Sequence, residues 1–124
     1  MFEISVEETF SSGHALRGYR GKCENPHGHN YRVRVCLAGP RLNAIGLLYD
    51  FKDLKQRIRQ ETERLDHQYL NDLEPFRDLN PSAENLARFL FERLRGLLQA
   101  DAEAVEIKSV TVFETDTTAA VYSP

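Results

Sequence analysis

A thiol, a carboxylate and two imidazoles lie within seven residues of this 124-residue chain, in the segment 23–29. They belong to Cys23, Glu24, His27 and His29. The two histidines are two positions apart, so in an extended segment both rings leave the same face. A strand end that presents two imidazoles in this way can supply two ligands to one metal ion. We therefore predict that the segment forms half of a catalytic zinc site.

Two alternating segments are expected to position this site. Residues 2–10 and 31–37 alternate apolar with polar side chains, which is typical of half-buried strands. Neighbouring strands joined by one connection are most simply antiparallel, so the end of the first lies beside the start of the second. His14 then comes next to His27 and His29, although it is thirteen residues before His27. This arrangement supplies a third ligand.

Three imidazoles leave the fourth position of a zinc ion open for water or a substrate oxygen, as catalytic sites do. Cys36 is out of phase with the histidines and is expected to point away from them. Two other interpretations stay open: loop histidines that bind no metal, or a structural site closed by Cys23 as fourth ligand. A thiolate near a dication can act as a base, which is the role we expect for Cys23.

Two further carboxylates are candidates for the chemistry. Asp66 precedes His67 just after a predicted helix, where it can orient the imidazole for proton transfer. A histidine favoured there by the helix dipole is the alternative. Glu114 shares the parity of Val110 and Val112 near a strand end. It is either a solvent-exposed group at the sheet edge or an anchor for the N–H groups of a ligand.

The rest of the chain predicts two helices and two strands. Asp50 is a good N-cap for a helix over 51–65, and residues 80–82 begin a second helix. Strands follow at 105–113 and 118–122. The apolar stripe of the first helix is Phe51, Leu54, Ile58, Thr62 and Leu65, and its polar side includes Glu61.

The resulting order, β-β-α-α-β-β, predicts an α+β fold in a single domain over residues 1–124. We expect a four-stranded antiparallel sheet with both helices on one face. The strands 105–113 and 118–122 are expected to be edge strands, which a monomer would leave unpaired. An oligomer that joins sheets edge to edge would satisfy them.

Charge and composition exclude several classes of protein. The formal net charge is −3, and no run of basic residues suggests a nucleic-acid partner. No apolar run approaches the about 20 residues of a membrane-spanning helix, and the N-terminus lacks a signal-peptide pattern. We therefore expect a cytoplasmic protein whose two cysteines are free thiols.

Several motifs appear in order along the chain: Phe10-Ser11-Ser12-Gly13-His14, Cys23-x3-His27-Gly28-His29-Asn30-Tyr31, Tyr49-Asp50-Phe51, Leu65-Asp66-His67, Asn80-Pro81-Ser82-Ala83-Glu84-Asn85 and Glu114-Thr115. This set resembles the 6-pyruvoyl-tetrahydropterin synthase and 6-carboxy-tetrahydropterin synthase family. The resemblance covers essentially the whole chain, and all four histidines fall on motif positions.

The resemblance implies the tunnelling fold, in which trimers close a barrel and two trimers stack into a homohexamer with active sites at subunit interfaces. It implies a Zn2+ cofactor bound by His14, His27 and His29. The implied substrate is a small-molecule pterin triphosphate, 7,8-dihydroneopterin triphosphate, from which Cys23 removes a proton.

The resemblance also implies roles for residues elsewhere in the chain. Asp66 and His67 match the pair that relays a proton. Glu114 matches the glutamate that anchors the pterin ring, and Thr115 lies beside it in the same motif. Lys22 is among the basic residues that could contact the triphosphate.

The product stays open. In the prokaryotic branch the implied reaction makes 6-carboxy-5,6,7,8-tetrahydropterin and acetaldehyde, a step towards queuosine, and this is the reaction we expect. Glu24, directly after Cys23, is a departure, because a folate-pathway subgroup uses a glutamate in this loop to make 6-hydroxymethyl-7,8-dihydropterin. The chain could perform either reaction, and an exposed, uninvolved Glu24 is the alternative. The remaining hypotheses are the 6-pyruvoyl product and a catalytically inactive module that binds zinc or pterin.

Overall fold

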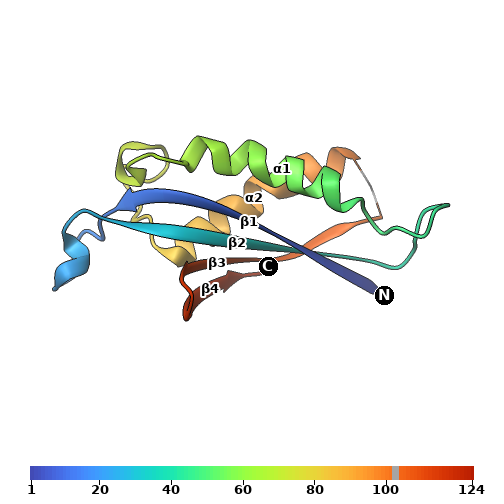
Figure 1. Ribbon diagram of the computed structural model, residues 1–124, viewed down its shortest axis with the longest axis horizontal. Helices are drawn as coiled ribbons and strands as arrows, with labels where there is room; N and C mark the ends of the chain where they lie inside the picture. The colour runs from blue at the N-terminus through green and yellow to red at the C-terminus, as the bar shows by residue number, and fades with distance from the viewer. Residues whose placement is uncertain (102–103) are drawn as a thin grey trace.

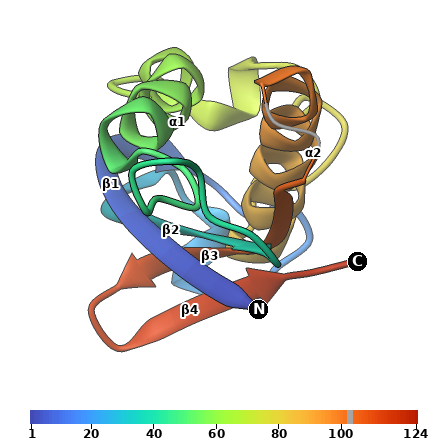
Figure 2. The same cartoon turned by 90° about the vertical axis from the view of Figure 1, so that its right-hand side faces the viewer.

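The computed structural model describes residues 1–101 and 104–124 as one sheet covered by two helices. The sheet is antiparallel, with its strands in the order β1-β2-β3-β4. Both helices lie on the same face (Figure 1, Figure 2), which confirms the predicted α+β architecture. The elements are β1 (Phe2–His14), η1 (Lys22–Glu24), β2 (His27–Gly39), α1 (Phe51–Leu65), η2 (Leu70–Asp72), α2 (Ala83–Asp101), β3 (Glu106–Thr115) and β4 (Thr118–Tyr122).

The first two strands are both longer than their apolar alternation predicts. Their antiparallel register pairs Phe2 with Gly39 at one end and His14 with His27 at the other. The polar residues 11–14 remain in the ladder because backbone hydrogen bonding to β2 does not depend on the side chain. The predicted position of His14 beside the start of β2 is confirmed.

β3 is an interior strand, so the prediction that it forms a sheet edge is wrong. It pairs with β2, from Arg32 opposite Phe113 to Ala38 opposite Glu106, and with β4 on its other side. The edge strands are β1 and β4. The element order could not decide this, because a connection through two helices does not fix which strand β3 returns to.

The first turn of α1 is only partly as predicted. Asp50 is the N-cap, and its carboxylate accepts hydrogen bonds from the backbone N–H groups of Lys52 and Asp53. Phe51 is 55% exposed, so its predicted place in the buried stripe is wrong. It lies at the start of the helix, by the outer edge of β1 near Val6.

Glu61 lies on the buried side of α1 and not on the polar side that the periodicity predicts. It is 3% exposed. Its carboxylate accepts hydrogen bonds from Arg93 of α2, from Nε at 3.1 Å and from Nη2 at 3.3 Å. This pairing across the helices is what allows a carboxylate to be buried at that position.

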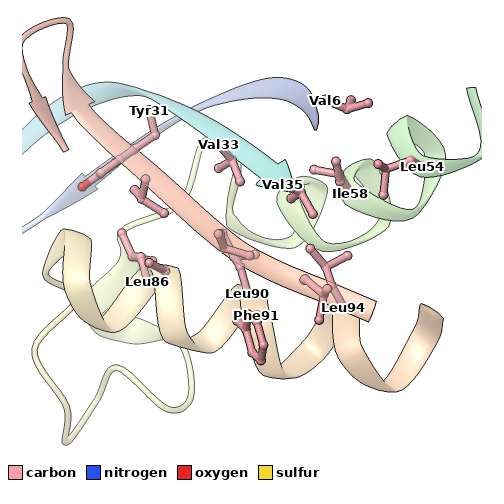
Figure 3. Close-up of a cluster of buried hydrophobic side chains, with 14 of the residues drawn as sticks. Val6, Tyr31, Val33, Val35, Leu54, Ile58, Leu86, Leu90, Phe91 and Leu94 are labelled. Atoms are coloured by element: carbon pink, nitrogen blue, oxygen red, sulfur yellow. The ribbon is translucent and has the colours of Figure 1, made fainter. Parts of the chain in front are cut away.

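The core lies between the sheet and the helices (Figure 3). Val33 and Val35 of β2 are fully buried, as are Leu86, Leu90 and Leu94 of α2. Burying each such side chain contributes about 1.5–3 kcal/mol. Odd-numbered residues of β2 face this layer, and that parity continues to the strand's first residue. Neither helix of the described residues has the length and apolar character that a membrane crossing requires.

We predict that Arg93→Ala lowers the free energy of unfolding by about 2–3 kcal/mol, because it leaves the Glu61 carboxylate buried without its partner. Arg88→Ala is the matched control, since Arg88 lies on the same helix and pairs with the exposed Glu92. This control should cost less than about 0.5 kcal/mol. Urea denaturation at one protein concentration measures both. Equal losses would contradict the role assigned to the buried pair.

Candidate active site

Three connections of the fold lie at the same end of the sheet (Figure 1). The connection from β1 to β2 carries Cys23, and the connection from α1 to α2 carries Asp66 and His67. The turn between β3 and β4 follows Glu114. Residues that are far apart in the sequence are therefore brought to one end of the molecule.

The three predicted metal ligands come together at this end. His14 ends β1 opposite His27, and His29 follows two residues along β2 on the same face. The ring centroids are 4.5 to 4.9 Å apart. One nitrogen from each ring lies within 4.8 Å of the other two. Small ring rotations would bring these nitrogens to the about 2.1 Å ligand distances of a zinc ion.

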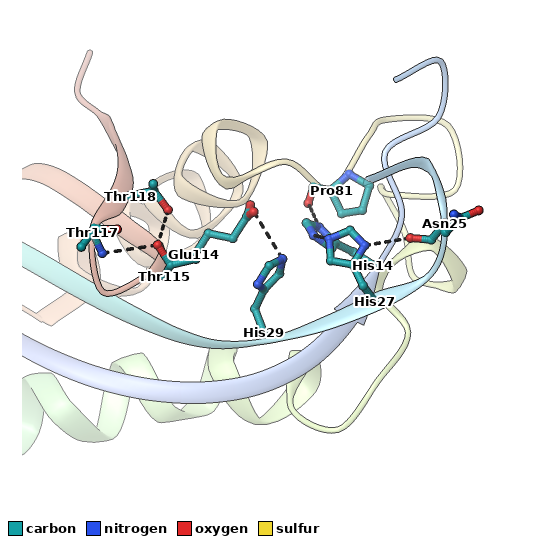
Figure 4. A network of polar contacts seen from close by, with 9 residues as sticks. All are labelled: His14, Asn25, His27, His29, Pro81, Glu114, Thr115, Thr117 and Thr118. Carbon is teal, nitrogen blue, oxygen red and sulfur yellow. Dashed lines mark hydrogen bonds and ion pairs between the residues drawn. The ribbon is translucent and has the colours of Figure 1, made fainter. Parts of the chain in front are cut away.

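In two of these rings the other nitrogen is already hydrogen-bonded to a carbonyl group (Figure 4). His14 Nδ1 lies 2.8 Å from the Pro81 carbonyl oxygen, and His27 Nδ1 lies 2.7 Å from that of Asn25. A carbonyl only accepts, so each Nδ1 carries the proton and each Nε2 presents a lone pair. The two Nε2 atoms are 3.0 Å apart. Burial lowers the pKa of His14, which disfavours a second proton on its ring. Two lone pairs at this distance fit a shared cation.

His29 supplies the third nitrogen and contacts Glu114. Its Nε2 lies 3.3 Å from Glu114 Oε1 (Figure 4). This contact does not satisfy hydrogen-bond geometry, and the buried Nε2 has no hydrogen-bond partner among the described residues. Burial lowers the pKa of His29, so the neutral ring, which is the form that binds metals, is favoured. The donor set of three imidazoles therefore fits zinc.

Tyr31 is a buried polar residue that sequence reasoning missed. Its hydroxyl group has no hydrogen-bond partner among the described residues, and the side chain is fully buried. Burial first, and then the Glu114 carboxylate, raise the pKa of Tyr31 well above its usual range, so the phenol stays protonated. Tyr31 is two residues after His29 on β2 and shares its face, and this spacing could have indicated that its hydroxyl group lies near the histidines. Thr115 lies farther out, where its hydroxyl bonds that of Thr118 at 2.6 Å.

Cys23 and Glu24 lie on η1, outside the histidine group. Within the part of the chain that the structure describes, that group contains three imidazoles and no thiol. The geometry therefore does not support a structural site closed by Cys23. The Cys23 carbonyl oxygen accepts a hydrogen bond from Leu16 N at 2.8 Å. Cys36 points to the opposite face, as predicted, with its Sγ 4.0 Å from a Glu3 carboxylate oxygen.

Asp66 and His67 contact each other at the outer edge of β1. His67 Nδ1 lies 2.8 Å from Asp66 Oδ2. Asp66 Oδ1 accepts a hydrogen bond from Ser11 N at 2.8 Å, and this bond, followed by that from His67, lowers the pKa of Asp66. The His67 backbone is left-handed, with φ at 56°, and its side chain is 82% exposed. The imidazole therefore faces solvent in a single chain.

Known proteins resemble this chain over almost its whole length. Residues 3–124 match the family model described as 6-pyruvoyl tetrahydropterin synthase. The chain is 35% identical to the 6-carboxy-5,6,7,8-tetrahydropterin synthase of Synechocystis sp., over 98% of the chain and 93% of that relative. It is also 35% identical to the human 6-pyruvoyl tetrahydrobiopterin synthase, over 97% of the chain and 90% of that relative.

Solved structures share the fold. The 6-pyruvoyl tetrahydropterin synthase of Caenorhabditis elegans superposes with a TM-score of 0.87 at 28% identity, over 99% of this chain and 95% of that one. A Plasmodium vivax 6-pyruvoyltetrahydropterin synthase superposes with a TM-score of 0.78 at 25% identity, over 99% and 97%. That structure is of a variant in which cysteine replaces a catalytic glutamate. These neighbours confirm the tunnelling fold that the sequence motifs imply.

We predict that the protein binds zinc through the three clustered imidazoles, so that His27→Asn and His29→Asn each weaken zinc binding at least about 100-fold. His67→Asn is the matched control, because this fourth histidine is exposed and lies outside the cluster. Competition with a coloured chelator measures the affinities. Wild-type affinity in His29→Asn, or an equal loss in His67→Asn, would contradict the assignment.

Proposed function

Because the chain belongs to the 6-pyruvoyl tetrahydropterin synthase family, we propose that it is a zinc-dependent lyase acting on 7,8-dihydroneopterin triphosphate. The proposed product is 6-carboxy-5,6,7,8-tetrahydropterin, released with acetaldehyde and triphosphate as one water is consumed. Relatives named for this synthase, such as that of Synechocystis sp., support the choice. The reaction would belong to queuosine synthesis, in the cytoplasm.

One observation carries the proposal. The Nε2 atoms of His14 and His27 are 3.0 Å apart, while both Nδ1 atoms are bonded to carbonyl groups. Neutral rings arranged in this way cannot hydrogen-bond to each other, and His29 adds a third buried nitrogen without a partner among the described residues. Zinc bound by the three imidazoles supplies a Lewis acid, which increases the acidity of nearby hydroxyl and C–H groups.

The proton transfers are assigned to residues of the connections. Cys23 acts as the base that removes a proton from the substrate side chain. His67 returns a proton, and Asp66, 2.8 Å from its Nδ1, orients the ring. Within the described residues of one chain, His67 faces solvent. This exposure suits the homohexamer that the family resemblance implies, in which active sites lie at subunit interfaces.

Glu114 and Thr115 are assigned to the pterin ring. If His29 Nε2 were a ligand of the metal, the Glu114 carboxylate beside it would be free to accept hydrogen bonds from N–H groups of the pterin. Thr115 adds a hydroxyl group at the adjoining turn. The carboxylate would fix the orientation of the ring, because it accepts from two adjacent donors at once.

A second product is favoured by a specific observation. Glu24 shares η1 with Cys23, and the Plasmodium vivax relative is described with a catalytic glutamate that was replaced by cysteine. A chain with both residues can use Glu24 as an alternative base and release 6-hydroxymethyl-7,8-dihydropterin for folate synthesis. The human relative's name adds the 6-pyruvoyl product as a third outcome.

We predict that mass spectrometry of products from 7,8-dihydroneopterin triphosphate detects 6-carboxy-5,6,7,8-tetrahydropterin with the wild-type protein. Cys23→Ala should reduce that product at least about 100-fold, because it removes the base. If Glu24 is a second base, only Glu24→Ala abolishes a hydroxymethyl product.

The same assay separates the alternatives. Unchanged products with Glu24→Ala would end the idea of dual use. Full activity of Cys23→Ala would contradict the role of the thiol, and a 6-pyruvoyl product alone would replace the proposed reaction.

A further inference from the structure

The outer edge of β1 is bonded to the α1–α2 connection at every second residue from Ser11 on. Ser11 N donates to Asp66 Oδ1 at 2.8 Å, and the Ser11 carbonyl oxygen accepts from His67 N at 2.6 Å. Gly13 N donates to the Gln68 carbonyl oxygen at 2.9 Å. The connection therefore acts as a short neighbouring strand for the end of β1.

Two asparagine side chains continue this edge beyond His14, where β1 has ended. The Asn71 amide accepts from Ala15 N at 2.9 Å and donates to the Ala15 carbonyl oxygen at 2.9 Å. The Asn80 amide does the same for Arg17, at 3.0 and 2.9 Å. Each amide thus replaces the pair of hydrogen bonds that the backbone of a neighbouring strand would make.

Leu16 lies between Ala15 and Arg17, the two residues that the asparagine amides bind, so its backbone groups face away from the asparagines. Its N–H group donates to the Cys23 carbonyl oxygen at 2.8 Å. Through this hydrogen bond, the position of Cys23 on η1 depends on the path of residues 15–17. The two asparagines on the opposite edge bind the backbone of that path, and the Arg17 side chain adds a hydrogen bond from Nη2 to the Phe76 carbonyl oxygen at 2.6 Å.

Both asparagines are themselves held by helical elements. Asn71 belongs to η2 and is 8% exposed. The Asn80 carbonyl oxygen accepts from Asn85 Nδ2 at 2.9 Å, and Asn85 N in the first turn of α2 donates to Ser82 Oγ at 3.1 Å. The Asn71 and Asn80 side chains are therefore attached to helical elements of the fold, and they can hold residues 15–17 in a fixed position.

We propose that Asn71 and Asn80 are positioning residues that hold Cys23 in place relative to the histidine ligands. The proposal rests on the proposed function only in giving Cys23 the role of base. A base must lie within hydrogen-bond reach of the proton that it removes, and a displacement of about 1 Å can cost about 100-fold in rate. The two amides restrict that displacement without touching the substrate or the metal.

The test uses Cys36→Ser as the background, so that Cys23 is the one remaining thiol of the two. In this background Asn80→Ala removes both side-chain hydrogen bonds to the Arg17 backbone, and Asn80→Asp keeps the acceptor but loses the donor. Asn80 is chosen because it is only half-buried. Asn43→Ala is the matched control, since Asn43 Oδ1 also binds backbone N–H groups, in the loop at the far end of the sheet (Figure 1).

We expect Asn80→Ala to increase the alkylation rate of Cys23 by iodoacetamide roughly tenfold, because two hydrogen bonds that order its segment are lost. The kcat for 7,8-dihydroneopterin triphosphate should fall about 10- to 100-fold with little change in KM. Asn80→Asp should give intermediate values. A merely stabilising role would lower the melting temperature and leave both rates, measured well below it, at those of Asn43→Ala.

Folded Asn80→Ala with the alkylation rate and kcat of Asn43→Ala would overturn the proposal. Failure of the proposed function looks different. In that case the parent protein itself lacks turnover, and the alkylation rates of Asn80→Ala and Asn43→Ala still decide whether the amide positions Cys23.

Discussion

Antiparallel pairing of β1 with β2 sets His14 opposite His27, and the alternation of β2 puts His29 on the same face. The buried residues Val33 and Val35, in the middle of β2, fix this register. A slip of β2 by one residue relative to β1 would turn these valines out of the core and move His27 and His29 together to the face opposite His14. The hydrophobic core and the metal-binding geometry therefore depend on one alignment of two strands.

Much of this alignment could be predicted from the sequence, because it follows from period-two patterns. The alternation of β2 predicted that His27 and His29 share a face and that Cys36 points to the other. The single connection between β1 and β2 predicted that His14 lies beside them. The same reasoning failed where neighbours from distant parts of the chain decide burial. Glu61 is buried because Arg93 reaches it from α2, which no periodicity within α1 reveals.

The residues that sequence reasoning missed act through contacts across long stretches of chain. Asn71 binds Ala15, and Asn80 binds Arg17, as side chains that substitute for a missing strand. In the sequence Asn80 looks like part of a helix start, and it is Ser82 that accepts the hydrogen bond of the first turn. Tyr31 reads as an ordinary core residue, yet its hydroxyl group has no partner in the part of the chain that the structure describes.

The central claim is that three imidazoles, without a sulfur ligand, bind one metal ion. X-ray absorption at the zinc edge of the zinc-loaded protein tests it most directly. The geometry predicts imidazole nitrogens at about 2.0–2.1 Å and no sulfur at about 2.3 Å, because the candidate ligand group contains no thiol within the described residues. A sulfur ligand at that distance would show that Cys23 or Cys36 closes the site, and would contradict an open catalytic centre.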